Sequence, residues 1–106
     1  MKRDVRDMWV EALRSGEFSQ TRNALKKHDG HCCLGVLCEI HPDVQFEDGP
    51  GGDTAVHTAY RHHNELPSSL LTAIELSRFQ MGRLMILNDD EHMSFDQIAE
   101  HIEKNL

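Results

Sequence analysis

An unbroken apolar run, Cys32-Cys33-Leu34-Gly35-Val36-Leu37-Cys38, sets the strongest limit on how this chain can fold. Such a run has to be buried, but its lack of periodicity does not by itself distinguish a helix from a strand. Asp29-Gly30 predicts a turn before the run, and His41-Pro42 predicts its end. We favour a buried helix over residues 32–41, in which Gly35 permits close packing, over a buried strand.

Apolar spacing predicts another helix near the start of the chain. Five residues fall at i, i+3, i+4, i+7 and i+8 and therefore share one helical stripe: Val5, Met8, Trp9, Ala12 and Leu13. Asp4 is placed to cap the start, and Gly16 can adopt the left-handed conformation that ends a helix. We expect a helix over residues 4–15, with Trp9 in the core and its indole N–H bonded to a partner.

Two capping boxes predict further helix starts. Ser77 is followed three residues later by Gln80, and Ser94 by Gln97, so in each pair the two side chains can satisfy the free amides of a first turn. Leu66-Pro67 opens another short helix. These signals predict helices over residues 67–76, 78–88 and 94–105.

Taken together, these elements predict a mainly α fold, a compact single domain spanning residues 1–106 with about five helices. A chain of 106 residues has room for one hydrophobic core. Residues 42–65 are expected to be a long irregular stretch. A small β-hairpin, which would make the fold α+β, is an open addition from residues 20–32 or 54–60.

The charge balance narrows the classes of partner. Eleven basic side chains stand against eighteen acidic ones, a formal net charge of −7. Binding to duplex DNA requires clustered cations, so this balance argues against it, and an acidic surface favours a basic partner. The chain has no apolar run near the ~20 residues that a membrane-spanning helix needs. We expect a soluble protein of the cell interior that carries no cofactor.

The order of several motifs resembles that of a family of small uncharacterised proteins found in bacteriophages, prophages and some bacterial chromosomes. The motifs are Trp9 to Gln20, the run Cys32 to Cys38, Leu66-Pro67, Leu87-Asn88-Asp89 and Ser94-Phe95-Asp96-Gln97-Ile98-Ala99. They span nearly the whole chain. The resemblance implies a small acidic accessory protein that acts in the cytoplasm of a bacterial host.

That context suggests a non-catalytic function. Accessory proteins of this kind often bind a host protein or protein complex, including defence systems such as restriction or CRISPR complexes, or sequester a small nucleotide signal. We therefore expect an anti-defence binding protein that contacts its partner through the acidic surface and residues 42–65.

A cysteine-dependent hydrolase or transferase is the first alternative. Cys32 or Cys33 at a helix start would have its thiolate stabilised by the helix dipole. His57 and Asn88 follow in the chain order Cys, His, Asn of papain-like enzymes. The sequence shows none of the local signatures of those enzymes, and we favour buried thiols that pack as apolar groups.

A zinc-stabilised binding module is the second alternative. Cys38 and His41 have the C-x2-H spacing of zinc ligands. A second ligand pair at the usual separation is absent from the sequence. An odd number of cysteines, two of them adjacent, also makes a poor disulfide framework, so we expect all three thiols to be free.

Two groups of residues are candidates for contacting a partner or nucleotide. One is the aromatic and cationic cluster beside the long loop, which comprises His57, Tyr60, Arg61, His62 and His63. The other is the polar pair Asn88-Asp89, which can face a shared pocket or simply form the turn between two helices.

Overall fold

The computed structural model describes residues 1–106 except 29, 43, 45, 49–55 and 60–64. Five helices and five short strands occur in the described ranges. The helices are α1 (Arg3–Arg14), α2 (Cys33–Ile40), α3 (Ser68–Ile74), α4 (Arg78–Asp89) and α5 (Phe95–Asn105). The strands are β1 (Ser19–Gln20), β2 (Lys26–Lys27), β3 (Gly30–His31), β4 (Phe46–Asp48) and β5 (Val56–Ala59). The predicted fold class, mainly α with a small β part, is confirmed.

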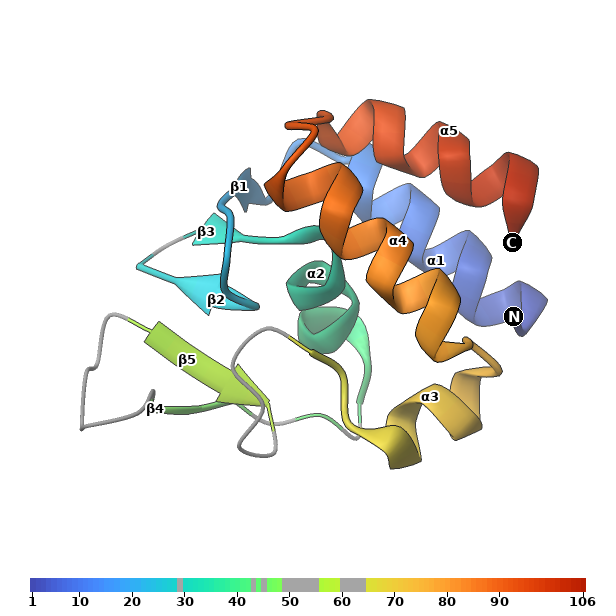
Figure 1. Cartoon of the computed structure of the whole chain (residues 1–106), viewed down its shortest axis with the longest axis horizontal. Helices are drawn as coiled ribbons and strands as arrows, with labels where there is room; N and C mark the ends of the chain where they lie inside the picture. The colour runs from blue at the N-terminus through green and yellow to red at the C-terminus, as the bar shows by residue number, and fades with distance from the viewer. Residues whose placement is uncertain (29, 43, 45, 49–55, 60–64) are drawn as a thin grey trace.

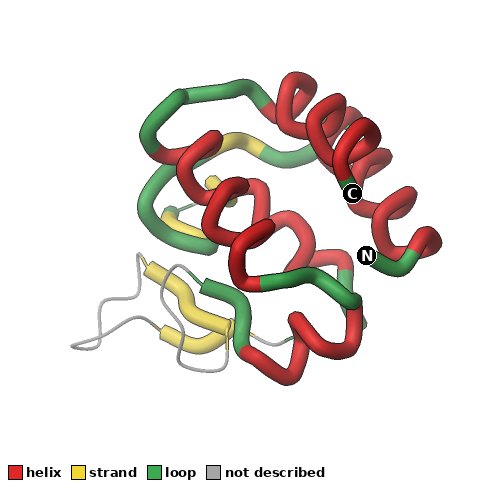
Figure 2. Tube along the Cα trace, turned by 45° about the vertical axis from the view of Figure 1, so that its right-hand side comes forward, coloured by secondary structure: helices red, strands yellow, loops and turns green. Residues whose placement is uncertain are grey.

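The helices surround α2, which lies at the centre of the fold (Figure 1). α1 and α4 both pack against α2, and α5 runs along α1 and also contacts α4. The short helix α3 lies beside the start of α4, and the strands gather on the other side of α2 (Figure 2). One hydrophobic core joins α2 to buried residues of the other four helices.

The apolar run forms the predicted helix α2, and all residues from Cys33 to Cys38 are buried. The indole Nε1–H of Trp9 donates to the carbonyl of Cys33 at 2.8 Å, so the predicted core position of Trp9 and its need for a partner are both confirmed. A Cβ on Gly35 would lie 1.7 Å from the carbonyl oxygen of Leu25. The predicted close packing at Gly35 is thus a contact between the backbone of α2 and the backbone of Leu25, which leaves no room for a side chain at position 35.

The predicted capping boxes both form. Ser77 caps α4 and Ser94 caps α5, each by accepting from the backbone amide three residues later. The side chains of Gln80 and Gln97 accept from the backbone amides of Ser77 and Ser94 in return. These helix starts are fixed locally, which is why sequence alone finds them.

Two details of α1 differ from the prediction. The N-cap is Lys2, and Asp4 lies inside the first turn rather than capping it. Met8 is 48% exposed, whereas Val10 is buried. The reason is that α1 contacts both α2 and α5, so its buried face widens to include Val10, while every residue of the expected stripe except Met8 still packs in or against the core. Gly16 follows the helix with φ +78°, as predicted.

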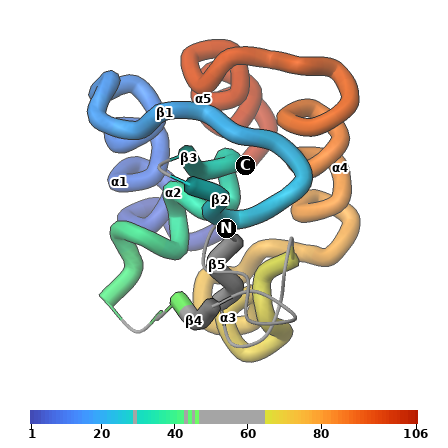
Figure 3. The backbone as a smooth tube through the Cα atoms, turned by 90° about the vertical axis from the view of Figure 1, so that its left-hand side faces the viewer, coloured from blue at the N-terminus to red at the C-terminus, as the bar shows by residue number. Residues whose placement is uncertain are grey.

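The strands form one sheet with the order β1-β3-β2-β5-β4. β1 pairs with β3 in parallel, and the remaining pairs are antiparallel. The irregular stretch predicted for residues 42–65 is therefore wrong where β4 and β5 form, since these segments find partners that their own short sequences do not reveal. Both proposed hairpin segments contribute strands. The link between β1 and β2 arches across the end of the molecule from α1 towards α4 (Figure 3).

In the part of the chain that the structure describes, no helix combines the length and the apolar character needed to cross a lipid bilayer.

Candidate functional site

Asn88, in the last turn of α4, joins separate parts of the chain through its side-chain amide. Its Oδ1 accepts hydrogen bonds from Nε2 of Gln20 at 2.9 Å and from the backbone N–H of Cys33 at 3.2 Å. Its Nδ2 donates to the carbonyl of Thr21 at 2.9 Å and to Oδ1 of Asp89 at 2.8 Å. The residue is 1% exposed. All four hydrogen-bonding positions of the amide are thus used inside the protein.

Asp89 and Gln20 extend this network along the link between β1 and β2. Oδ1 of Asp89 also accepts from the backbone N–H of Asn23 at 3.0 Å. Nε2 of Gln20 also donates to the carbonyl of Met93 at 2.8 Å. The network holds the arching link against the end of α4, and of the predicted polar pair only Asp89 is partly exposed.

The three cysteine thiols are free and buried, as expected. Burial raises the pKa of Cys32 to about 12, although the backbone N–H of Gly35 donates to its Sγ at 3.3 Å. Burial likewise raises the pKa of Cys33 and of Cys38 well above the ordinary thiol value. A nucleophilic cysteine has to ionise near neutral pH, and here the interior opposes ionisation.

The residues of the hydrolase alternative are only partly brought together. Asn88 contacts Cys33, but through the backbone amide and not through the thiol. The thiol of Cys33 faces the carbonyl of Leu84, with Sγ and the oxygen 3.7 Å apart. His57 lies in β5, where its backbone pairs with Lys26, and its side chain lies outside the described residues.

The residues of the zinc alternative lie near the end of α2. Cys38 is buried within the helix, and His41 is the C-cap residue. Zinc sites in proteins usually have four protein ligands, or three and a water. Among the described residues, no group of three or more His, Cys, Asp and Glu side chains is placed to hold a metal ion.

The rest of the predicted loop cluster, Tyr60, Arg61, His62 and His63, lies outside the described residues. Its proposed contact with a partner therefore stays a prediction.

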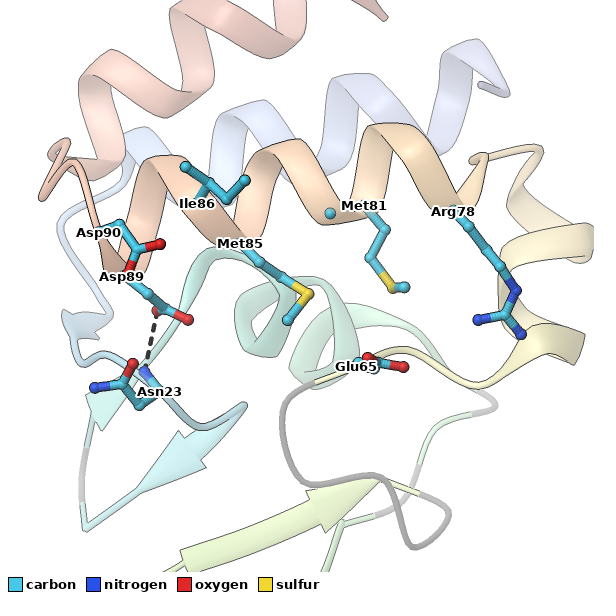
Figure 4. A pocket seen from close by; sticks show the side chains of 9 residues that line it. Asn23, Glu65, Arg78, Met81, Met85, Ile86, Asp89 and Asp90 are labelled. Carbon is cyan, nitrogen blue, oxygen red and sulfur yellow. Dashed lines mark hydrogen bonds between the residues drawn. The ribbon is translucent and has the colours of Figure 1, made fainter.

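Sequence reasoning missed a groove of about 390 Å³ along one side of α4. Met81, Gly82, Met85 and Ile86 of α4 form its apolar part. Figure 4 shows Met81 and Met85 projecting from α4 towards the segment that carries Glu65. We refer to this hollow as the α4 groove. Two apolar residues of the predicted helix over 78–88 could have signalled an open face, because Phe79 is 85% exposed and Ile86 is 44% exposed.

The rim of the α4 groove is acidic. Glu65, Asp89 and Asp90 supply three carboxylates, and Arg78 supplies one guanidinium. Arg78 also donates to the hydroxyl of Ser68. Asn23 completes the rim where its backbone N–H meets Asp89 (Figure 4). The groove thus combines an apolar floor with an excess of negative charge.

A second polar cluster lies where the sheet meets α2. Nε2 of His31 is 2.8 Å from Oε2 of Glu39, and the imidazole packs between the rings of Phe18 and Phe46. Nζ of Lys26 is 3.4 Å from the same carboxylate oxygen. Burial alone would raise the pKa of Glu39, but the hydrogen bond with His31 and the charge of Lys26 outweigh it and hold that pKa below its ordinary value.

Comparison with known proteins supplies one match. A family model described as a domain of unknown function (DUF8296) matches residues 1–106. Searches of the curated proteins and of the solved structures found no matching protein.

Proposed function

We propose that this chain, which belongs to the DUF8296 family, is a non-catalytic binding protein that contacts a host component through the α4 groove and the acidic surface around it. The observation that carries the proposal is the contrast between the buried cysteine thiols and the exposed apolar side chains of α4. The thiols lie in the core with raised pKa values, whereas apolar side chains of α4 remain exposed beside carboxylates.

Exposed apolar side chains in a hollow are a common property of binding surfaces. Ile86 is 44% exposed and lines the groove, so the core does not account for its apolar character. Met85 beside it is only half-buried. Covering both side chains with a partner would remove apolar area from water, which favours association.

The resemblance to small phage and prophage proteins supports a more specific form of the proposal. In that form the chain is an accessory protein that acts in the cytoplasm of a bacterial host and counters a defence system such as a CRISPR complex. The partner is then a host protein or protein complex. Sequestering of a nucleotide signal is the less favoured form, because the carboxylates around the groove would repel its phosphates.

The test is capture of host proteins from a bacterial lysate by the tagged chain, with matched variants. Ile86→Glu places a charge in the groove, and Met8→Glu makes the same change at a similarly exposed residue of α1. We expect the wild-type chain and Met8→Glu to retain the same host protein in stoichiometric amount, and Ile86→Glu to lose it. Mass spectrometry of the eluate reports proteins and nucleotides together.

Two outcomes would count against the proposal. If the wild-type chain retains no host protein, a binding function of this kind is wrong. If Ile86→Glu retains as much as Met8→Glu, the partner binds elsewhere on the surface.

A further inference from the structure

We infer that the occupant of the α4 groove is a basic amphipathic segment of the partner protein, which makes its closest approach at Gly82. This inference rests on the proposed binding function and adds the chemistry of the partner to it.

The first observation is a glycine that the fold does not require. Gly82 lies in the interior of α4, where glycine costs roughly 1 kcal/mol relative to alanine. A Cβ at this position would meet nothing within 4 Å, in contrast to Gly35, where it would collide with the backbone. The missing side chain therefore leaves open space on the groove side of α4. An approaching segment could pack directly against the helix backbone there.

The second observation is the apolar surface on either side of Gly82. Met81 and Met85 are unbranched and flexible, so they can adapt to the side chains of a partner. Ile86 lies one turn beyond Gly82 and is 44% exposed. α4 has 12 residues and is therefore about 18 Å long. A partner segment of comparable length would cover the apolar part of the groove.

The third observation is charge. Asp89 and Asp90 lie at one end of the groove, and Glu65 lies opposite α4 (Figure 4). The groove lining thus has three carboxylates and one guanidinium, that of Arg78. The chain as a whole carries a formal charge of −7. Lysine or arginine side chains on the partner would meet these carboxylates, so charge complementarity selects a basic segment.

The same charges disfavour two other occupants. A second copy of this chain placed face to face would bring together two groove rims that each carry three carboxylates and one guanidinium, so the two rims would repel each other. A nucleotide would bring phosphates to the same carboxylates. Like charges held close together destabilise a complex, so both become outcomes of the test and not the inference itself.

The experiment measures fluorescence anisotropy of two labelled peptides of about four helical turns, roughly 14 residues. One is built of leucine and lysine in a helical i, i+3, i+4 pattern, and its twin has glutamate in place of every lysine. At near-physiological salt, about 0.15 M, we expect the lysine peptide to bind the wild-type chain and the glutamate twin not to bind. ATP is added as a competitor, and sedimentation velocity records self-association.

Variants locate the binding. Gly82→Leu fills the open space, and Asp90→Lys reverses one rim charge. Glu11→Lys makes the same charge reversal on α1, outside the groove. We expect each groove variant to weaken binding of the lysine peptide about tenfold or more, and Glu11→Lys to bind nearly as the wild type does. Gly82→Ala, whose Cβ meets nothing, keeps the fold in place and should weaken binding less than Gly82→Leu.

The inference fails if Glu11→Lys weakens binding as much as Asp90→Lys, because the peptide is then attracted by the net negative charge of the chain and not by the groove carboxylates. It also fails if Gly82→Leu binds normally, if ATP displaces the peptide at an equal concentration, or if two copies associate through this face. Retention of the same host protein by wild type and Gly82→Leu would overturn the inference while leaving the binding function intact. Peptide binding without any retained host protein would instead remove the proposed function.

Discussion

Asn88 connects the end of α4 to the start of α2 and to the link between β1 and β2. It accepts from the backbone amide of Cys33 and donates to the carbonyl of Thr21, two groups that would otherwise lie unpaired next to the core. Only an amide offers two donors and an acceptor of two bonds at this position. Sequence analysis named Asn88 as a candidate for binding or catalysis, whereas its contacts show that it holds parts of the fold together.

Asn88→Ala should therefore destabilise the protein by roughly 3 kcal/mol, because buried partners left without hydrogen bonds each cost ~1–3 kcal/mol. Asn105→Ala is the matched control, since Asn105 is exposed on α5, and it should change the stability by at most about 0.5 kcal/mol. Urea unfolding followed by circular dichroism measures both. If Asn88→Ala lowers the free energy of unfolding by less than the control does, the network of Asn88 does not hold the fold together.

The thiols give a second prediction at this scale. Because Cys32, Cys33 and Cys38 are buried and their pKa values are raised, a thiol reagent at neutral pH should label none of them in the native protein at an appreciable rate. All three should react once urea unfolds the chain. Rapid labelling of a single thiol in the folded state would contradict the structure and would favour the hydrolase alternative.

At the scale of elements, α2 and α4 each contain a glycine, for opposite reasons. Gly35 lets α2 pack against the backbone of Leu25, whereas Gly82 leaves α4 open to the surface. Sequence analysis predicted the first, because a glycine within an apolar run signals close packing. It did not predict the second, because the α4 groove forms between α4 and residues distant in sequence, such as Asn23 and Glu65.

The two alanine variants should change the stability in opposite directions. Gly35→Ala should cost about 3 kcal/mol or more, because its Cβ would lie 1.7 Å from a backbone oxygen. Gly82→Ala should stabilise the protein by about 0.5–1 kcal/mol, since alanine is the better helix former and the site is open. Thermal unfolding compares them with the wild type. Destabilisation by Gly82→Ala would mean that the fold itself needs this glycine.

The elements that sequence analysis found are those with local signals. Capping at Ser77 and Ser94 depends on residues three positions away. The buried face of α5 consists of apolar residues that recur at helical spacing within that one helix. β4 and β5 have only three and four residues, and β5 pairs with β2, about thirty residues earlier. Pairing of such short strands depends on the finished fold, which no short window of sequence contains.

For the whole molecule, the junction between the sheet and α2 makes stability depend on pH. Glu39 lies on α2, and the groups that face it are His31 of β3 and Lys26 of β2. Its pKa is held below the ordinary value of 4.5, so the folded state favours the ionised carboxylate. This contribution to stability is present above pH 4.5 and is lost as the pH falls through the lowered pKa.

Glu39→Gln should therefore unfold more easily than the wild type at neutral pH, and the difference should shrink as the pH falls well below 4.5. Glu11→Gln, an exposed change on α1, serves as the control and should show a smaller difference at every pH. Urea midpoints across the pH range measure the effect. A difference that stays constant down to the lowest pH would show that the carboxylate charge is not involved.

The central claim is that the α4 groove, and not the buried cysteine thiols, carries the function of this protein. The most direct measurement replaces Ile86 with the photo-crosslinking residue benzoylphenylalanine and irradiates bacterial cells that express the chain. Met8, exposed to a similar degree on α1, receives the same replacement as the control. We predict one discrete crosslinked host protein from position 86 and none from position 8. A host protein that crosslinks from position 8 but not from position 86 would contradict the account.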